Sequence, residues 1–308
     1  MTLFRSDRIR LAGVAATAAL FWLTPAAHAQ QTFNSPDDAA AALASAVKSG
    51  SRQDIIKVLG PDGEDIIVSG DETADKAERD MFVTAYDAKH SVKVDGKRAT
   101  LIVGPDDFPF AIPLFHAKSG WEFDTEQGRQ EILYRRIGRN ELDTIQTCLA
   151  FVDAEDEYAE KDRGEGIGVY AQRIVSSPGK MDGLYWPSDK NDSPLGALAA
   201  EASAEGYKAG SEPRPYHGYY YRVLTQQGAS APGGAMSYIV KGKMIGGFGL
   251  IAYPADYGNS GVMTFMVSHA GLVYQKDMGQ DTEARVKSMT SFDPDKTWKV
   301  VDETNSKR

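Results

Sequence analysis

Residues 124–160 have the sequence DTEQGRQEILYRRIGRNELDTIQTCLAFVDAEDEYAE. Asp124 and Thr125 can cap the start of a helix, because short oxygen-bearing side chains accept hydrogen bonds from its first free N–H groups. Apolar residues follow at helical spacing at Ile132, Leu133, Ile137, Leu142, Ile145, Leu149 and Val152. Gly138 interrupts this pattern, and a glycine costs about 1 kcal/mol in a helix interior. One long helix and two helices that meet at a kink near Gly138 therefore both stay open.

Helices followed by an antiparallel sheet are expected on the N-terminal side of this stretch. The predicted helices cover residues 36–49, 52–59 and about 73–88, the last with Ala77, Met81, Phe82, Ala85 and Tyr86 on one face. The hydrophobic period then changes to two, and Asp95-Gly96 is a preferred pair for a hairpin turn. The predicted hairpins cover residues 92–103 and 112–123. This order of elements indicates an α+β domain with three helices.

A second antiparallel sheet is expected on the C-terminal side. Residues 164–215 are rich in Gly, Pro, Ser and Asp, which predicts a long irregular connection with one helix at 195–205. Short strands separated by turn residues follow at 219–224, 235–240, 247–253, 262–267 and 272–275, and a last short helix follows at 281–289. The long helix is expected to pack on this sheet. We place the domain boundary at Gly138, which gives domains of residues 30–137 and 138–308.

The first 29 residues are typical of a cleavable signal peptide. Three arginines lie among residues 1–10, an apolar run extends from residue 11 to residue 23, and Ala27-His28-Ala29 supplies the small residues that a signal peptidase requires. A membrane-spanning helix needs about 20 apolar residues, so the run is too short to span, and an uncleaved anchor is the alternative. We expect cleavage between Ala29 and Gln30, a periplasmic or secreted location, and no stable membrane anchor afterwards.

The composition excludes some partners and cofactors. There are 34 basic and 43 acidic residues, a net charge of −9, and an acidic protein repels the phosphate backbone of nucleic acids. The histidines beyond the leader are His90, His116, His217 and His269, and they have no metal-ligand spacing. We therefore expect no nucleic-acid partner, no metal site and no cofactor.

Several blocks of the sequence resemble a family of exported bacterial proteins known as domain of unknown function 2950. The blocks are GWEFD at 120–124, RRIGRNE at 135–141, GYYYRVL at 218–224, APGGA at 231–235, YPADYG at 253–258 and GVMTF at 261–265. The resemblance covers most of the chain after the leader. It implies no activity and no catalytic residues.

Two weaker resemblances concern the fold of each half. An amphipathic helix, an irregular loop and the tyrosine-rich and glycine-rich segments 218–221, 252–254 and 258–261 are similar to the globular part of type IV pilin-like proteins. The hydrophobic N-terminal helix on which pilins polymerise is missing here, which argues against fibre assembly. The N-terminal half is similar to a nuclear-transport-factor-2-like or cystatin-like fold, a class that includes both binding proteins and enzymes.

Cys148 is the only cysteine, so an intrachain disulfide is impossible. It shares an apolar helical stripe with Ile145 and Leu149, which predicts a small buried hydrophobic residue. A nucleophile or an intermolecular disulfide partner is the alternative.

Two clusters of charge lie on the long helical segment. Arg135, Arg136 and Arg139 either pack onto acidic residues across the domain boundary or bind an anion. Six acidic residues follow, namely Asp153, Glu155, Asp156, Glu157, Glu160 and Asp162. We predict a solvated face for them, with cation binding as the alternative.

The predicted contact residues gather around His217. They are Tyr216, His217, Tyr219, Tyr220 and Tyr221, together with Tyr253 and Tyr257. Aromatic walls around one titratable group are typical of a ligand pocket, whereas alternate tyrosines that cover the core and the sheet are the structural alternative. Because tyrosine is enriched at protein interfaces, we predict that the solvent-facing members contact a partner.

Two functions stay open. The first is a non-catalytic envelope protein that contacts another exported protein. The second is a small-ligand carrier or a hydrolase-type enzyme with a pocket in the N-terminal domain, for which Asp71, His90, His116 and Asp124 are the candidate residues. No nucleophile and base stand at a recognisable spacing, so binding is favoured over catalysis. A carboxylate or histidine of perturbed pKa in a deep pocket would favour the second function, and its absence would favour the first.

Overall fold

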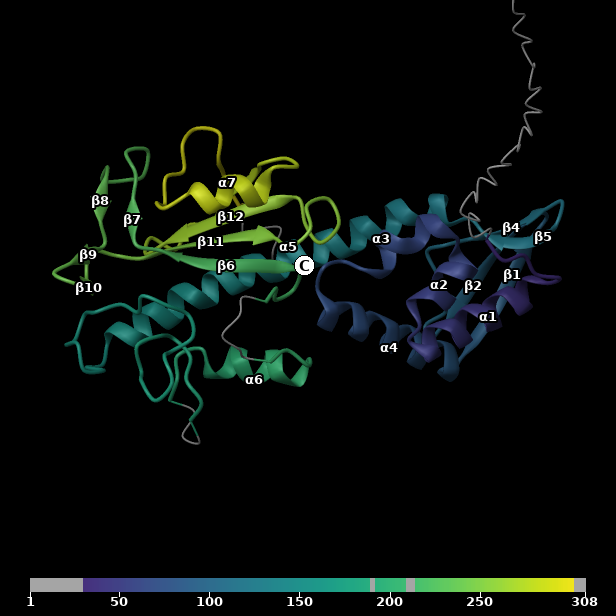
Figure 1. Cartoon of the computed structure of the whole chain (residues 1–308), viewed down its shortest axis with the longest axis horizontal. Coiled ribbons are helices and arrows are strands. Elements are labelled where there is room, and N and C mark those ends of the chain that lie inside the picture. The colour runs from purple at the N-terminus through teal and green to yellow at the C-terminus, as the bar shows by residue number, and fades with distance from the viewer. Residues whose placement is uncertain (1–29, 189–191, 209–213, 302–308) are drawn as a thin grey trace, which may run out of the picture.

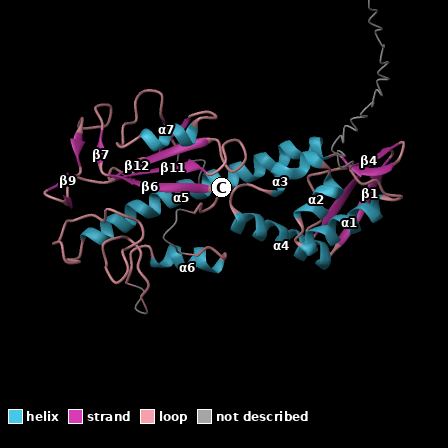
Figure 2. Cartoon of the chain, viewed as in Figure 1, coloured by secondary structure: helices cyan, strands magenta, loops and turns pink. Residues whose placement is uncertain are grey.

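The computed structural model describes residues 30–188, 192–208 and 214–301. Two lobes lie along its longest axis, and one helix, α5 (Thr125–Ala159), extends from the N-terminal lobe into the C-terminal lobe (Figure 1). Both lobes combine helices with antiparallel strands (Figure 2), so the expected α+β class is confirmed. The predicted signal peptide, with Ala29, lies outside the described residues. Within the described ranges no helix is long and apolar enough to cross a membrane.

The N-terminal lobe packs short helices against a small antiparallel sheet. The helices are α1 (Pro36–Ser49), α2 (Arg52–Leu59), the 3₁₀ helix η1 (Pro61–Gly63), α3 (Glu64–Ile67) and α4 (Glu72–Ala88). The strands are β1 (His90–Asp95), β2 (Arg98–Val103), β3 (Phe108–Pro109), β4 (Leu114–Ala117) and β5 (Gly120–Phe123). They pair in the order β1-β2-β4-β5, with β3 on β2, so both predicted hairpins are confirmed.

Local side-chain chemistry explains where the first helices begin and end. The hydroxyl of Ser35 accepts a hydrogen bond from the amide of Asp38 at 3.0 Å, and the hydroxyl of Ser51 accepts one from the amide of Asp54 at 3.2 Å. Each bond satisfies one of the free N–H groups of a helix N-terminus. Gly50 ends α1 at φ 68°, a left-handed conformation that glycine adopts without a Cβ clash.

α5 is one continuous helix of 35 residues that passes through Gly138 without a break, so the kinked alternative is wrong. Its N-terminus is capped by Asp124, whose carboxylate accepts a hydrogen bond from the amide of Gln127 at 3.2 Å. The hydroxyl of Thr125 donates to the carbonyl of Leu59 at 2.5 Å and ties the helix to α2. Since α5 belongs to both lobes, the domain boundary at residues 137 and 138 falls inside a helix and stays a prediction.

The C-terminal lobe packs the second half of α5 against a five-stranded antiparallel sheet. Its strands are β6 (Tyr219–Leu224), β11 (Gly249–Pro254), β12 (Met263–Ser268), β13 (Tyr274–Asp277) and β14 (Lys299–Val300), in the order β14-β13-β12-β11-β6. Shorter elements complete the lobe, namely α6 (Gly196–Ala204), β7 (Gln226–Gln227), β8 (Met236–Ser237), β9 (Ile239–Val240), β10 (Lys243–Met244) and α7 (Thr282–Ser288). The antiparallel sheet, both short helices and four of the predicted strands, which correspond to β6, β11, β12 and β13, agree with the sequence prediction. The strand predicted at 235–240 is wrong as a member of this sheet, because it is divided between β8 and β9, which pair elsewhere, and β14 forms the fifth strand instead.

The core of the C-terminal lobe lies between α5 and this sheet. Cys148 and Phe151 of α5 pack there with Phe248, Leu250 and Phe265. Cys148 is completely buried, as predicted, and burial raises the pKa of its thiol to about 12. A thiol that resists ionisation is a poor nucleophile, which leaves Cys148 as a packing residue.

Two of the predicted helix faces are wrong at particular residues. In α4, Ala77 and Met81 are exposed, while Tyr86 is buried in the lobe. In the acidic run, Glu155 is completely buried instead of solvated, and one of its carboxyl oxygens accepts a hydrogen bond from the amide of Ala171 at 2.8 Å. Burial raises the pKa of Glu155 well above its usual value, because a carboxylate loses its hydration there.

We predict opposite effects for alanine at two glycines of α5. A Cβ at Gly138 would meet no atom within 4 Å. Gly138→Ala should therefore raise the free energy of unfolding by about 0.5–1 kcal/mol through its better helix propensity. A Cβ at Gly128 would lie 2.6 Å from the Cα of Ile112, so Gly128→Ala should lower that free energy. Urea denaturation measures both, and a destabilised Gly138→Ala would contradict the continuous helix.

Candidate functional site

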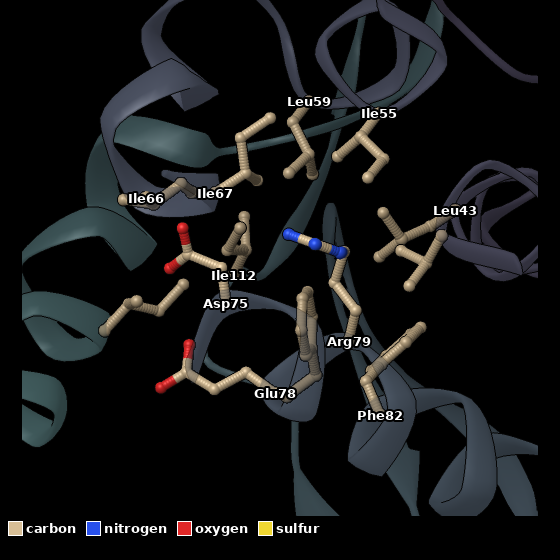
Figure 3. Close-up of a pocket in the computed structure, with 13 residues that line it drawn as sticks. Leu43, Ile55, Leu59, Ile66, Ile67, Asp75, Glu78, Arg79, Phe82 and Ile112 are labelled. Carbon is tan, nitrogen blue, oxygen red and sulfur yellow. The ribbon is translucent and has the colours of Figure 1, made fainter. Parts of the chain in front are cut away.

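A pocket of about 200 Å³ lies in the N-terminal lobe between α1, α2, α4 and the start of α5. Ten apolar side chains line it, from Leu43, Val47, Ile55, Leu59, Ile66, Ile67, Phe82, Phe110, Ile112 and Ile132. Asp75, Glu78 and Arg79 of α4 complete the wall (Figure 3). Val47, Phe82 and Ile132 are only half-buried, so the pocket reaches the surface.

One face of α4 supplies the polar part of the pocket. Asp75, Glu78, Arg79 and Phe82 are spaced by three or four residues, which places them on the same side of a helix. Both carboxyl oxygens of Asp75 accept from the amide of Ser69, each at 3.1 Å. Burial raises the pKa of Asp75. This effect is larger than that of the Ser69 hydrogen bonds and of the positive charge of Arg136, which lower the pKa.

Glu78 is already paired with arginines of α5. One of its carboxylate oxygens contacts the guanidinium of Arg139, and the other lies 3.6 Å from that of Arg136. Arg135 pairs with Glu131 in its own helix at 2.7 Å. Arg136 and Arg139 of α5 thus form ion pairs with an acidic residue of the N-terminal lobe. This agrees with the prediction that the basic cluster packs onto acidic residues across the domain boundary.

Arg79 differs from these arginines because it has no counter-charge. Figure 3 shows its guanidinium pointing into the space between Leu59, Ile55 and Ile112. It makes no hydrogen bond, ion pair or ring contact with any residue of the described ranges. The guanidinium of Arg79 can therefore pair with an anionic or polar group of a ligand.

Asp71 lies where the two lobes meet, outside the pocket. It is 1% exposed, and one carboxylate oxygen caps α4 by accepting from the amides of Thr73 and Ala74 at 3.1 and 3.0 Å. The other oxygen accepts from the hydroxyl of Tyr207 at 2.9 Å and from the amide of Gly218 at 3.0 Å. A carboxylate that accepts four hydrogen bonds has no acceptor position left for a ligand. Asp71 is therefore a structural link between the lobes.

Arg136 forms a second link between the lobes. Its guanidinium donates to the carbonyls of Asp65 and Ile66, at the end of α3, and to the side-chain oxygen of Asn259. The side-chain amide of Asn259 donates in turn to the carbonyl of Val68 at 2.8 Å. We call the contacts of Asp71, Arg136 and Asn259 the junction.

His217 closes the junction on the side of α6. Its Nδ1 lies 2.9 Å from the carboxylate of Asp143, and its Nε2 lies 2.8 Å from that of Glu205. Burial favours the neutral imidazole, but the hydrogen bonds and charges of the two carboxylates outweigh it and raise the pKa of His217. His217 adopts φ 50°, a conformation that few residues other than glycine take.

The side chains of the predicted tyrosine cluster contact other residues of the protein. The hydroxyl of Tyr219 donates to the carbonyl of Met263 at 2.9 Å, and that of Tyr221 to the hydroxyl of Thr144 at 3.3 Å. The rings of Tyr220 and Tyr253 lie 5.6 Å apart, those of Tyr216 and His217 lie 4.1 Å apart, and Tyr257 donates to Asp277. Tyr219 is fully buried and the others are half-buried. Their contact with a partner stays a prediction.

The other residues proposed for a pocket do not line it. The ring of His90 stacks on that of Tyr86 at 3.8 Å, the ring of His116 packs edge-on against that of Trp121, and Asp124 caps α5. The sequence does not single out Asp75, Glu78 and Arg79 as site residues, because their charge suggests an outward face. Their spacing of three and four from Phe82 is the signal that places them inward.

The polar groups that this arrangement offers to a ligand are the carboxyl groups of Asp75 and Glu78 and the guanidinium of Arg79. The lining that the structure describes includes no Ser, Thr, Cys, His or Lys side chain. No group of three or more His, Cys, Asp and Glu that could hold a metal ion occurs in the described part of the chain.

Comparison with known proteins gives one match. A family model described as "Protein of unknown function (DUF2950)" matches residues 30–301. No curated protein and no solved structure matches the chain.

We predict that the stability of the protein falls with rising pH through His217. Its pKa is raised above 6.5, so the folded state keeps the proton to higher pH than the unfolded chain. The stabilisation is complete below the unfolded-state pKa and is lost as pH rises through the folded-state pKa. Unfolding free energies from about pH 5.5 to about pH 9 should show this fall, and His217→Gln should remove it.

The matched control is His116→Gln, since the ring of His116 packs on Trp121 and contacts no carboxylate that the structure describes. This variant should keep the wild-type slope. An unchanged slope in His217→Gln would show that the two carboxylates do not hold the proton.

Proposed function

This chain belongs to the DUF2950 family, and from that premise we propose that it binds a small apolar molecule in the pocket of its N-terminal lobe without transforming it. The observation that carries the proposal is the pocket wall, in which ten apolar side chains surround about 200 Å³ of space. An engineered apolar cavity of about 150 Å³ is enough to bind benzene. The pocket therefore suits a ring or a short hydrocarbon chain.

The position of Asp75 favours ligand binding in the pocket over a function that involves protein contacts alone. A carboxyl group of raised pKa in the pocket wall is the feature that the sequence analysis set as favouring a ligand carrier or an enzyme. The hydrolase alternative has less support, since Glu78, the other carboxyl group of the lining, is paired with Arg136 and Arg139. Of a small-ligand carrier and a hydrolase-type enzyme, the geometry therefore favours the carrier.

Several expectations about context accompany this proposal. The leader supports export and cleavage before Gln30, which would place the protein in the periplasm or outside the cell. The packing of α5 on the C-terminal sheet supports a pilin-like lobe, and the helices on the N-terminal sheet support a nuclear-transport-factor-2-like or cystatin-like lobe. Contact with another envelope or secreted protein is supported by the tyrosine density of residues 216–221 alone.

The isoleucines of the pocket provide a direct test by NMR. With ¹³C-labelled isoleucine methyl groups, titration with 1-octanol should shift the signals of Ile55, Ile67, Ile112 and Ile132 in a saturable manner. The signals of Ile145 and Ile251, in the cores of the other lobe, serve as internal controls and should not move. Shifts spread over both lobes, or no shift at all, would refute the proposal.

We predict that Ile132→Trp blocks the pocket and weakens 1-octanol binding at least about tenfold, because the indole fills space that the ligand needs. Leu133→Trp is the matched control, since Leu133 is the next residue of α5 and does not line the pocket. It should bind like the wild type. Equal binding by both variants would place the ligand elsewhere.

A further inference from the structure

Arg79 introduces a charge where the pocket is otherwise apolar. Its guanidinium lies among Leu59, Ile55 and Ile112, and it has no ion-pair or hydrogen-bond partner in the parts of the chain that the structure describes. Arg79 is half-buried, so its guanidinium loses part of its hydration without a counter-charge from the described residues. A ligand anion would supply that counter-charge.

The acidic residues that line the pocket are already engaged. Both carboxyl oxygens of Asp75, four residues before Arg79, accept from the Ser69 amide, and burial raises the pKa of this carboxyl group. Glu78 is paired with Arg136 and Arg139. Among the charged residues of the lining, Arg79 is thus the one without a partner in the described parts of the chain.

We infer that the ligand of this pocket is a small apolar carboxylate, whose carboxylate group pairs with Arg79 and whose hydrocarbon part contacts the isoleucine wall. This inference rests on the proposed function. The guanidinium presents parallel N–H donors that match the two oxygens of a carboxylate. An ammonium ligand would be repelled by the Arg79 guanidinium, and a neutral ligand would leave this guanidinium unpaired.

The test compares three ligands with the same hydrocarbon chain, namely octanoate, 1-octanol and octylamine, by isoleucine-methyl NMR at neutral pH. Octanoate should bind the wild type about tenfold more tightly than 1-octanol, the value for a charge-assisted hydrogen bond reduced by partial solvent exposure. Octylamine should bind more weakly than 1-octanol.

Two substitutions in α4 separate the role of Arg79 from that of net charge. Arg79→Met keeps an apolar stem and should bind octanoate no better than 1-octanol, while Arg79→Lys should keep part of the preference. Lys76→Met removes the same charge from the same helix, but Lys76 is exposed and does not line the pocket. This control should retain the full preference for octanoate.

The outcomes distinguish the inference from the proposed function. If 1-octanol shifts the pocket isoleucines but octanoate binds no more tightly, the pocket binds ligands and the carboxylate inference is wrong. The carboxylate inference is also wrong if Arg79→Met keeps the preference, or if Lys76→Met loses it equally. If none of the three ligands shifts these signals, the proposed function fails, and the inference fails with it.

Discussion

The buried guanidinium of Arg136 is the interaction on which the arrangement of the two lobes depends. It is 3% exposed at the middle of α5, so its charge is buried. Its Nε has no hydrogen-bond partner among the described residues, and the burial of the charge therefore depends on the bonds that the other two nitrogens make. Its donors reach the carbonyls of Asp65 and Ile66 in one lobe and the side chain of Asn259 in the other. The planar fork of arginine makes these bonds in several directions at once, which the point charge of a lysine cannot do. The wall of the pocket at Ile66 is therefore held by the same group that joins the lobes.

Asp71 provides a second link between the lobes through a buried negative charge. It caps α4 with one carboxylate oxygen and binds the C-terminal lobe through Tyr207 and Gly218 with the other. Gly218 has φ 74°, and a Cβ there would lie 2.5 Å from the side-chain nitrogen of Asn140, so the close approach requires glycine. The position of α4, and with it the polar face of the pocket, depends on contacts from residues more than 130 positions away.

Local elements could be predicted from the sequence because their signals are local. Strand β6 has the predicted bounds, since a run of aromatic and aliphatic residues that favour strands, between turn residues, defines it without reference to the rest of the chain. The inward face of α4 could not be predicted from an apolar stripe, because Asp75 and Arg79 point inward and Met81 points outward. Glu155 was missed for the same reason: one buried carboxyl group is indistinguishable, in sequence, from its exposed acidic neighbours. The links through Asp71 and Arg136 join residues far apart in the chain, which no local pattern encodes.

The charge of Arg79 is unpaired because the acidic residues of the pocket lining bind other groups near the junction. Asp75 and Arg79 are four residues apart in α4, a spacing at which opposite charges ordinarily pair. Here Asp75 accepts the amide of Ser69 instead, which fixes the connection between α3 and α4. Glu78 turns to the arginines of α5, since Arg136 needs a counter-charge once it is buried between the lobes. Both acids of the pocket lining thus serve the architecture. The charge of Arg79 is left without a partner in the described parts of the chain, which is why a ligand anion is its natural counter-charge.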